Sequence, residues 1–374
     1  MMDQLIALCL IGSGHAAQDP WHPQSRIDKM LEIRWEEGNP FPWTYNGGSV
    51  GRIGDYVVYM TGFGRRVPDE LKSVDGYYDG YHRLLAAYHI PSQRWEQVRP
   101  LFPGKARAYG VYSVSDGVHA YCVGGQSYED PFCFRDVYRL CRAETEWSWE
   151  RLPDLPCATA EAGCVLLNRT LYVFGGDHYA MEGPHKGWDS TVENVGRRLH
   201  TLDLDEIEAG WRALKDCPGT PRSHHALAPA GGKLYALGGI FSHQGKHWNC
   251  VDNWCYDPAK DDWSRVRDLP IPCGGWSSKT WKDRFILLFG GYWGREIRNP
   301  DGSTRPPYGC DSASFSNSVL VYDATEDLFS EANPMPRAIN DPRLVWLDDH
   351  TVMNVTGEIP GGRRIPCVLV GHLR

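Results

Sequence analysis

Short apolar runs that end in a glycine pair recur along the whole chain. The clearest copies are HAYCVGG up to Gly125, RTLYVFGG up to Gly176, KLYALGG up to Gly239 and RFILLFGG up to Gly291. Two weaker copies, DYVVYMTG and TVMNVTG, end at Gly62 and Gly357, and consecutive copies lie 51 to 66 residues apart. Self-similarity at such a period indicates a repeat architecture in which each repeat is one supersecondary unit.

A second landmark follows each glycine pair. An apolar run leads into a short turn, after which an aromatic residue opens a polar strand; these aromatic residues are Trp95, Trp149, Trp211, Trp263 and Phe329. One more strand, such as HHALAPAG or AGCVLLN, lies before the next glycine pair. Each unit therefore predicts four short strands that form one antiparallel sheet.

The residue types suit a radial arrangement of such sheets. Glycine allows backbones to approach where sheets converge on an axis, and it tolerates positive φ. Tryptophan and tyrosine fill the wider gaps between sheets farther out. We therefore predict that Trp149, Trp211 and Trp263 are structural residues between neighbouring sheets.

The chain resembles the Kelch family of β-propellers from about Leu31 to its C-terminus. The resembling features are the glycine pairs, the outer tryptophans and the pairs Tyr256-Asp257 and Tyr322-Asp323. The resemblance implies an all-β fold of radially packed, four-stranded blades. It implies little about activity, because this fold hosts many functions.

The two ends of the chain supply the last blade together. Residues 31–43, LEIRWEEGNPFPW, match the end of a repeat, whereas the last unit, from Pro342, has only three strands. We therefore predict a single six-bladed propeller over residues 18–374, with the last blade at 337–374. A closing strand near residues 31–37, around Trp35, completes that blade.

The first residues predict export. Residues 1–17 contain an apolar core followed by Ala16 and Ala17, as in a degraded signal peptide, although Asp3 stands where a basic residue is usual. The expected location is periplasmic or secreted. The twelve cysteines favour a cytoplasmic alternative, because without Cys9 their number is odd and they are scattered.

Charge and cysteine spacing limit the partners. The net charge is −8 and no long basic stretch occurs, so we expect no nucleic-acid partner. No segment after the first seventeen residues is apolar enough to span a membrane. Cys122, Cys164, Cys255 and Cys367 fit strands as small apolar residues. Zinc-like cysteine spacing does not recur, so we expect no structural metal.

The strand count places chemistry on one face of the ring. The loops after the glycine pairs and the connections between blades both lie at the mouth of the central channel, which is the expected binding site. Arginines with aromatic residues suit an anionic sugar. The candidate substrate contacts are Arg65, Arg107, Tyr109, Arg222, His224, Trp276, Asn340, Asp341, Arg343 and Arg363. The alternative is that several of them cap strands or pair with each other.

One motif on this face, from Gly357 to Pro366, resembles a loop of the N-acetylneuraminate epimerase family, the sialic acid mutarotases. In that family a glutamate follows a blade's glycine and an arginine six residues later faces the same pocket. The resemblance implies that Glu358 and Arg364 are catalytic residues of a cofactor-free sugar mutarotase. The alternative is an ion pair that stiffens the loop.

Other functions stay open. A glycan- or protein-binding module needs no catalytic residue. A galactose-oxidase-like copper enzyme, also a Kelch propeller, would need histidines such as His224 and His178 and a set of tyrosine partners that we do not recognise. A glycosidase would need two acidic groups at a set separation, for which Glu161, Asp341 and Glu358 are candidates.

Overall fold

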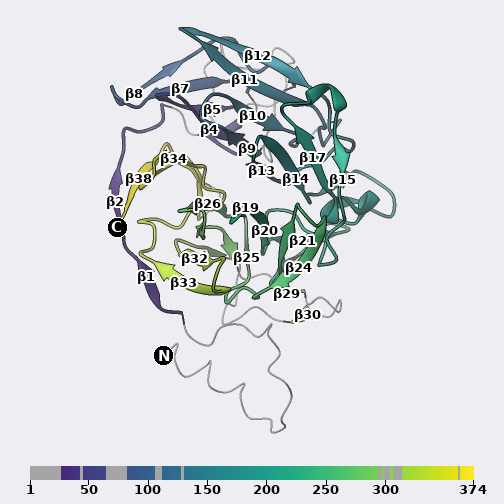
Figure 1. Ribbon diagram of the computed structural model, residues 1–374. Helices are drawn as coiled ribbons and strands as arrows, with labels where there is room; N and C mark the ends of the chain where they lie inside the picture. Colours follow the sequence, from purple (N-terminus) through teal and green to yellow (C-terminus); the bar gives the residue numbers. More distant parts are fainter. Residues whose placement is uncertain are drawn as a thin grey trace.

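The computed structural model is a ring of six four-stranded antiparallel sheets (Figure 1), and the predicted six-bladed fold is confirmed. It describes residues 27–42, 45–64, 82–105, 112–127, 130–293, 297–298, 304–305, 314–360 and 363–374. The predicted signal peptide at residues 1–17 lies outside these residues. No helix in the described ranges is long and apolar enough to cross a membrane.

Blades 1 to 3 follow one another without interruption. From the axis outwards, blade 1 consists of β4 (Ser49–Ile53), β5 (Tyr56–Met60), β7 (Leu85–His89) and β8 (Arg94–Gln97). Blade 2 consists of β9 (Tyr112–Ser115), β10 (Ala120–Val123), β11 (Val137–Ala143) and β12 (Glu146–Leu152). Blade 3 consists of β13 (Gly163–Leu167), β14 (Thr170–Phe174), β17 (Leu199–Asp203) and β18 (Arg212–Ala213). Two short 3-10 helices, η3 (Val192–Arg197) and η4 (Ile207–Ala209), lie in the connections of blade 3.

Blades 4 to 6 repeat this order. Blade 4 consists of β19 (Ala226–Ala230), β20 (Lys233–Leu237), β23 (Asn253–Asp257) and β24 (Asp262–Val266). Blade 5 consists of β26 (Ser277–Trp281), β27 (Phe285–Phe289), β32 (Val319–Asp323) and β33 (Leu328–Ala332). Blade 6 consists of β34 (Leu344–Asp348), β35 (Thr351–Val355), β38 (Val368–Leu373) and β2 (Ile33–Glu37). The first strands of successive blades contact each other all the way round, including β34 against β4.

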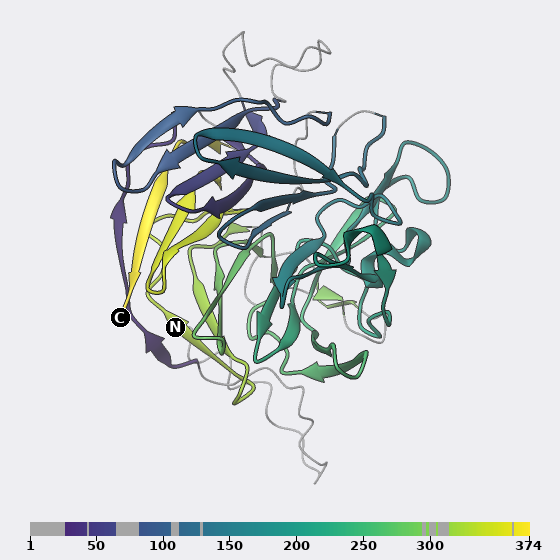
Figure 2. The same ribbon diagram turned by 45° about the horizontal axis from the view of Figure 1, so that its top comes forward.

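The N-terminal strand closes the ring as predicted. Strand β2 pairs antiparallel with β38, with Trp35 opposite Gly371, and the N-terminal and C-terminal strands lie side by side in Figure 2. The structure adds a strand that the sequence did not predict, because β1 (Lys29–Leu31) pairs parallel with β33. The N-terminal segment therefore holds the outer edges of both blade 5 and blade 6.

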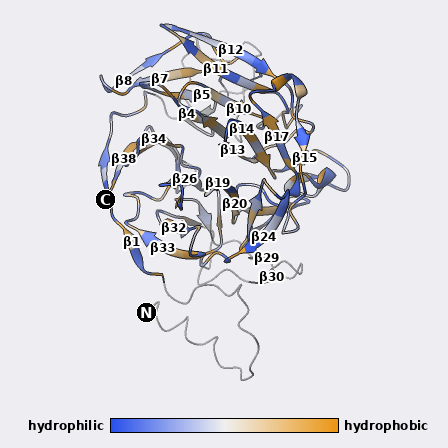
Figure 3. Ribbon diagram, in the orientation of Figure 1, coloured by the Kyte–Doolittle hydropathy of each residue, from blue (hydrophilic) through white to orange (hydrophobic). Residues whose placement is uncertain are grey.

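The core consists of six apolar clusters, one between each pair of neighbouring blades. Between blades 3 and 4, for example, Phe174 contacts Trp263 with ring centroids 5.0 Å apart. In Figure 3 the polar outer strands β12 and β24 are largely blue. Among the cysteines, Cys255 is buried in the cluster between blades 4 and 5, Cys164 is half-buried, and Cys367 lies just before β38.

The outer tryptophans join neighbouring blades, which confirms their predicted place. Each indole nitrogen donates a hydrogen bond to a backbone carbonyl that follows the outer strand of the preceding blade. The pairs are Trp95 with Asn39 at 3.3 Å, Trp149 with Pro100 at 3.3 Å, Trp211 with Pro153 at 2.8 Å and Trp263 with Lys215 at 2.7 Å. Burial differs, since Trp263 is 7% exposed whereas Trp149 and Trp211 are half-buried.

The glycine pairs mark places where blades approach too closely for a side chain. Gly176 has φ of 115°, and a Cβ there would lie 1.9 Å from Thr159 Oγ1 and 2.8 Å from the Ala160 carbonyl oxygen. In the two weaker copies a threonine takes the first position, and Thr61 and Thr356 keep positive φ values of 60° and 64°. The backbone turn is therefore common to strong and weak copies.

Removal of residues 1–38 should destabilise the whole ring. Leu31 and Ile33 are 3% and 2% exposed in the cluster between blades 5 and 6, and loss of two such side chains costs about 3–6 kcal/mol. Denaturant unfolding should show a lower midpoint than for the matched control, which lacks only residues 1–26. Equal midpoints for the two truncations would contradict closure by β2.

Replacement of Trp263 by alanine should lower the free energy of unfolding by about 3–5 kcal/mol, as for other buried aromatic truncations. Trp149→Ala and Trp211→Ala should cost less, because these side chains are half-buried. Leu328→Ala, at a residue 42% exposed, is the control and should change stability by less than ~0.5 kcal/mol. Equal losses for Trp263→Ala and Leu328→Ala would contradict the burial of Trp263 between blades 3 and 4.

Candidate ligand-binding site at the channel mouth

Loops and connections meet at one end of the ring, as the strand count predicted. In blades 1 and 5 they form short ladders, β3 (Tyr45–Asn46) with β6 (Phe63–Gly64) and β25 (Cys273–Gly274) with β28 (Tyr292–Trp293). In three other blades they form single bridges, Ala160 with Asp177, Ser223 with Ile240 and Asn340 with Glu358. In each of these blades, the residue that follows the glycine pair is thus paired through its backbone with the segment that leads into the first strand of the same blade.

The next residue of each connection has a left-handed backbone. Gly47, Glu161, His224, Gly275 and Asp341 have φ between 52° and 72°. Non-glycine residues adopt this conformation infrequently, at a cost of order 1–3 kcal/mol that the surrounding structure has to impose. Glu161, His224 and Asp341 are therefore held in a costly conformation by their surroundings.

Backbone hydrogen bonds link these residues from blade to blade. The His224 N–H donates to the Glu161 carbonyl at 2.9 Å, and the Gly275 N–H donates to the His224 carbonyl at 2.8 Å. The Asp341 N–H donates to the Gly275 carbonyl at 2.8 Å. Blades 3 to 6 are therefore joined edge to edge at the mouth, which fixes the starting points of three ionisable side chains.

These side chains form one electrostatic group. His224 Nε2 lies 3.7 Å from Glu161 Oε2, and Arg343 Nη2 lies 2.5 Å from Asp341 Oδ2. Burial raises the pKa of Asp341 to about 6, because the ion pair with Arg343 offsets only part of the lost hydration. The negative charges of Glu161 and Glu358 raise this pKa further.

A buried carboxylate, Asp177, orients the histidine. Ser223 Oγ and Ser242 Oγ lie 2.7 and 2.8 Å from Asp177 Oδ2, and Ser190 Oγ donates to Oδ1. His224 Nδ1 lies 2.9 Å from Ser223 Oγ. Because the serine proton goes to Asp177, we assign the Nδ1 proton to the hydrogen bond with Ser223. Burial raises the pKa of Asp177, although His224 and the serine hydroxyls oppose this shift.

The predicted catalytic pair lies on a hairpin beside this group. Strand β36 (Glu358–Ile359) pairs with β37 (Arg363–Arg364), and the register places Arg364 opposite Glu358 and Arg363 opposite Ile359. The Asn340 N–H donates to the Glu358 carbonyl at 2.8 Å. Glu358 is therefore anchored next to Asp341, and Arg364 rather than Arg363 is its cross-strand partner.

The structure brings together five of the ten predicted substrate contacts and both predicted catalytic residues. His224, Asn340, Asp341, Arg343 and Glu358 share the mouth, and the backbones of Arg363 and Arg364 adjoin it. Three predicted contacts, Arg65, Arg107 and Tyr109, lie outside the described residues.

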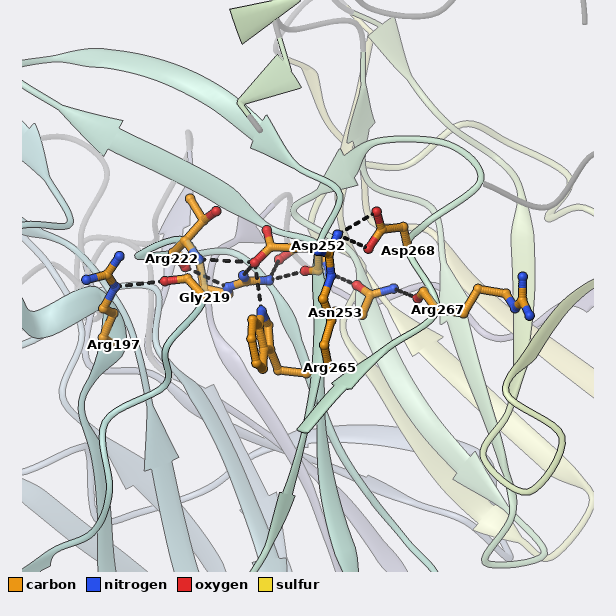
Figure 4. Close-up of polar contacts among 11 residues, drawn as sticks. Arg197, Gly219, Arg222, Asp252, Asn253, Arg265, Arg267 and Asp268 are labelled. Atoms are coloured by element: carbon orange, nitrogen blue, oxygen red, sulfur yellow. Dashed lines mark hydrogen bonds and ion pairs between the residues drawn. The ribbon is translucent and has the colours of Figure 1, made fainter. Parts of the chain in front are cut away.

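Two predicted contacts have structural places instead. Arg222 is fully buried and donates to the Thr220, Gly238 and Asp252 carbonyls at 3.0, 3.1 and 2.6 Å, while its Nη2 lies 2.5 Å from Asp252 Oδ2 (Figure 4). Its guanidinium thus binds the chain itself. Trp276, 4% exposed, lies in the apolar cluster between blades 4 and 5.

Two acidic residues of the mouth, Asp177 and Glu161, were not among the predicted substrate contacts. Asp177 follows the glycine pair of blade 3 just as Glu358 follows the glycine of blade 6. Glu161 occupies the same place in its connection as His224 and Asp341 do in theirs. The signal that marks both is their equivalent position in successive repeats.

The fold and the mouth define a class, the six-bladed β-propellers with a polar site at one end of the channel. The KLHDC2/KLHL20/DRC7 Kelch-repeats domain matches residues 110–344. The chain belongs to the Kelch-repeat family.

Its relatives carry different names. The chain is 22% identical to Kelch-like protein 36 of Bos taurus over 84% of this chain and 44% of that protein. It is 23% identical to N-acetylneuraminate epimerase of Yersinia enterocolitica over 59% of this chain and 57% of the enzyme. It is 24% identical to N-acetylneuraminate epimerase of Brucella melitensis over 58% of each. The chain thus spans about half the length of these relatives.

A solved structure shares the fold. The structure of YjhT superimposes with a TM-score of 0.68 at 14% identity, over 90% of this chain and 99% of that chain. At this identity the likeness concerns the fold alone.

Proposed function

We propose that the channel mouth binds a small acidic sugar and accelerates the interconversion of its anomers. The observation that carries this proposal is the gathering of Glu161, His224, Asp341 and Glu358 at the mouth, with Arg364 opposite Glu358. Two relatives named N-acetylneuraminate epimerase support a sialic-acid-type substrate. The location expected from the sequence, periplasmic or secreted, belongs to the same proposal.

The reaction needs proton transfers and no redox step. A base removes the proton of the anomeric hydroxyl while an acid protonates the ring oxygen, so that the ring opens and recloses on the other face of the carbonyl carbon. Glu358 is the proposed acid–base group. His224 is a second one, since its Nδ1–H is held by Ser223 and its Nε2 lies near Glu161.

The substrate carboxylate needs a cation. Arg364 is the proposed partner because it stands opposite Glu358, and guanidinium binds carboxylate in a bidentate manner. Arg343 is a second positive charge in this region, paired with Asp341. Its pairing depends on pH, since Asp341 loses its charge below a pH of about 6.

Glu358→Gln should abolish catalysed anomer exchange and keep binding, because the side-chain shape is retained and proton transfer is lost. NMR of a freshly dissolved single anomer of N-acetylneuraminate measures exchange, and calorimetry measures binding. Glu208→Gln is the matched control, since Glu208 is exposed in η4 between two outer strands. Arg364→Ala should mainly weaken binding.

Two outcomes would overturn parts of this proposal. Wild-type protein that binds the sugar without faster exchange would be a glycan-binding module and no mutarotase. Wild-type protein that binds neither acidic nor neutral sugars would shift the function to the protein-binding alternative. Unchanged exchange in Glu358→Gln would move the acid–base role to another residue, with His224 first.

Affinity for the acidic sugar should rise as the pH falls through about 6. The ligand carboxylate stays ionised there, with an ordinary pKa of ~3.5, while Asp341 loses the negative charge that opposes binding of an anion. Removal of one of two like charges that lie about 4 Å apart is worth about 1 kcal/mol in water, or roughly fivefold in affinity. Asp341→Asn should bind with this higher affinity at neutral pH and depend less on pH than wild type does.

The comparison sugar in this titration is a neutral N-acetylated hexose. Its affinity should not follow the ionisation of Asp341, because it carries no charge. Equal pH dependence for both sugars, or pH dependence in Asp341→Asn as large as in wild type, would exclude Asp341 as the cause.

A further inference from the structure

Two hairpins from neighbouring blades lie side by side above blades 3 and 4. One consists of β15 (His178–Ala180) and β16 (Gly187–Asp189), and the other of β21 (Ile240–His243) and β22 (Lys246–Cys250). The Gly245 N–H donates to the Trp188 carbonyl at 3.1 Å, and the Ser190 N–H donates to the Ser242 carbonyl at 2.8 Å. These backbone contacts fix the relative position of the two hairpins.

Three metal-ligating side chains meet at this contact. The donor atoms of His185, Asp189 and His243 all lie within 4.8 Å of one another. His185 Nδ1 and His243 Nδ1 are each 3.0 Å from Asp189 Oδ2. The Asp189 side chain is fully buried, whereas the His185 and His243 side chains are 43% and 39% exposed. The cluster thus has a buried anionic floor and a solvent-accessible rim.

The carboxylate is oriented before any ion arrives. Its other oxygen, Oδ1, accepts the Thr191 N–H at 2.8 Å and the Thr191 hydroxyl at 2.6 Å. Oδ2 is thereby aimed at the two imidazoles. Outer hydrogen bonds of this kind commonly orient metal ligands in proteins.

The atoms around Oδ2 fit two chemical arrangements. Without an ion, Oδ2 accepts hydrogen bonds from His185, His243 and the Gln244 N–H at 3.3 Å, with both imidazoles protonated on Nδ1. With a cation between them, the two neutral Nδ1 atoms and Oδ2 each direct a lone pair at the ion.

We infer that His185, Asp189 and His243 form a binding site for a divalent transition-metal ion of the zinc class, which links blade 3 to blade 4. Ligand bonds of about 2.0–2.1 Å place neighbouring donors ~2.9–3.4 Å apart for angles between octahedral and tetrahedral, in agreement with the 3.0 Å separations. Two imidazoles and one carboxylate suit zinc and its neighbours rather than magnesium or calcium. The exposed rim leaves room for water as a further ligand.

The position of this site connects it to the channel mouth. Ser190 follows Asp189 and donates to Asp177, and Ser242 precedes His243 and also contacts Asp177. Asp177 in turn holds Ser223 beside His224. A bound ion would therefore restrain both hairpins that orient the histidine. This inference departs from the expectation of no metal, which rested on cysteine spacing, because one of the three ligands, His243, lies 54 residues from Asp189 in the sequence.

The test is a titration of untagged, chelator-treated full-length protein with Zn²⁺, followed by calorimetry. We expect one equivalent to bind and the thermal midpoint to rise. His185→Ala and the double variant His185→Ala/His243→Ala should weaken binding by more than the roughly 10–100-fold that loss of an outer partner costs. His350→Ala, an exposed histidine in the turn between β34 and β35, is the matched control and should behave as wild type.

Co²⁺ distinguishes this site from adventitious binding by cysteine, since thiolate ligation adds a charge-transfer band that nitrogen and oxygen ligands lack. One equivalent of Co²⁺ without that band, lost in His185→Ala, is the expected result. His185 lies on the surface, so circular dichroism should show an intact fold in this variant. Failure of wild type to bind either ion, or unchanged stoichiometry in the double variant, would overturn the inference.

Discussion

Closure of the ring is the constraint on which the rest of the structure depends. Every apolar cluster is shared by two neighbouring blades, so no blade has a complete core of its own. An open ring would expose one such cluster and leave a sheet edge unpaired. Pairing of β2 with β38 prevents both, and β1 extends the same segment across the edge of blade 5. The first and last residues of the fold thus stabilise the same part of the ring.

The closed ring also fixes the geometry of the channel mouth. Glu161, His224 and Asp341 keep positive φ because bridges to the glycine-pair loops and hydrogen bonds to neighbouring blades hold both sides of each residue. Such strain persists only where the surroundings impose it. Ionisable groups that start from fixed backbone positions need little reorganisation to bind a ligand or exchange a proton. The fold therefore supplies what the proposed chemistry needs without placing any of these residues on a free loop.

The fold could be predicted from the sequence because its determinants are local and periodic. Glycine pairs, outer tryptophans and the incomplete last unit each leave a signal at a known spacing. Strand β1 left no such signal in the sequence, because a three-residue strand that pairs at the edge of a sheet needs no alternation of apolar and polar residues. The site was less predictable. The order of the strands places Arg222 in a connection at the mouth. It does not predict that Arg222 pairs with Asp252, which lies 30 residues away in the sequence. His243 and Asp189 are 54 residues apart and meet only because two hairpins lie side by side.

Charge decides what the mouth can bind. Glu161, Asp341, Glu358 and Asp177 lie within one electrostatic neighbourhood, opposed among the described side chains by Arg343 and, when protonated, His224. An excess of carboxylates repels an anionic sugar unless some of them are neutral or a cation faces the ligand. Burial makes Asp341 and Asp177 the ones most readily neutralised. In the proposed reaction, neutralisation of these two buried carboxylates would reduce the repulsion of an acidic substrate, and Glu358, which is less buried, would transfer the proton.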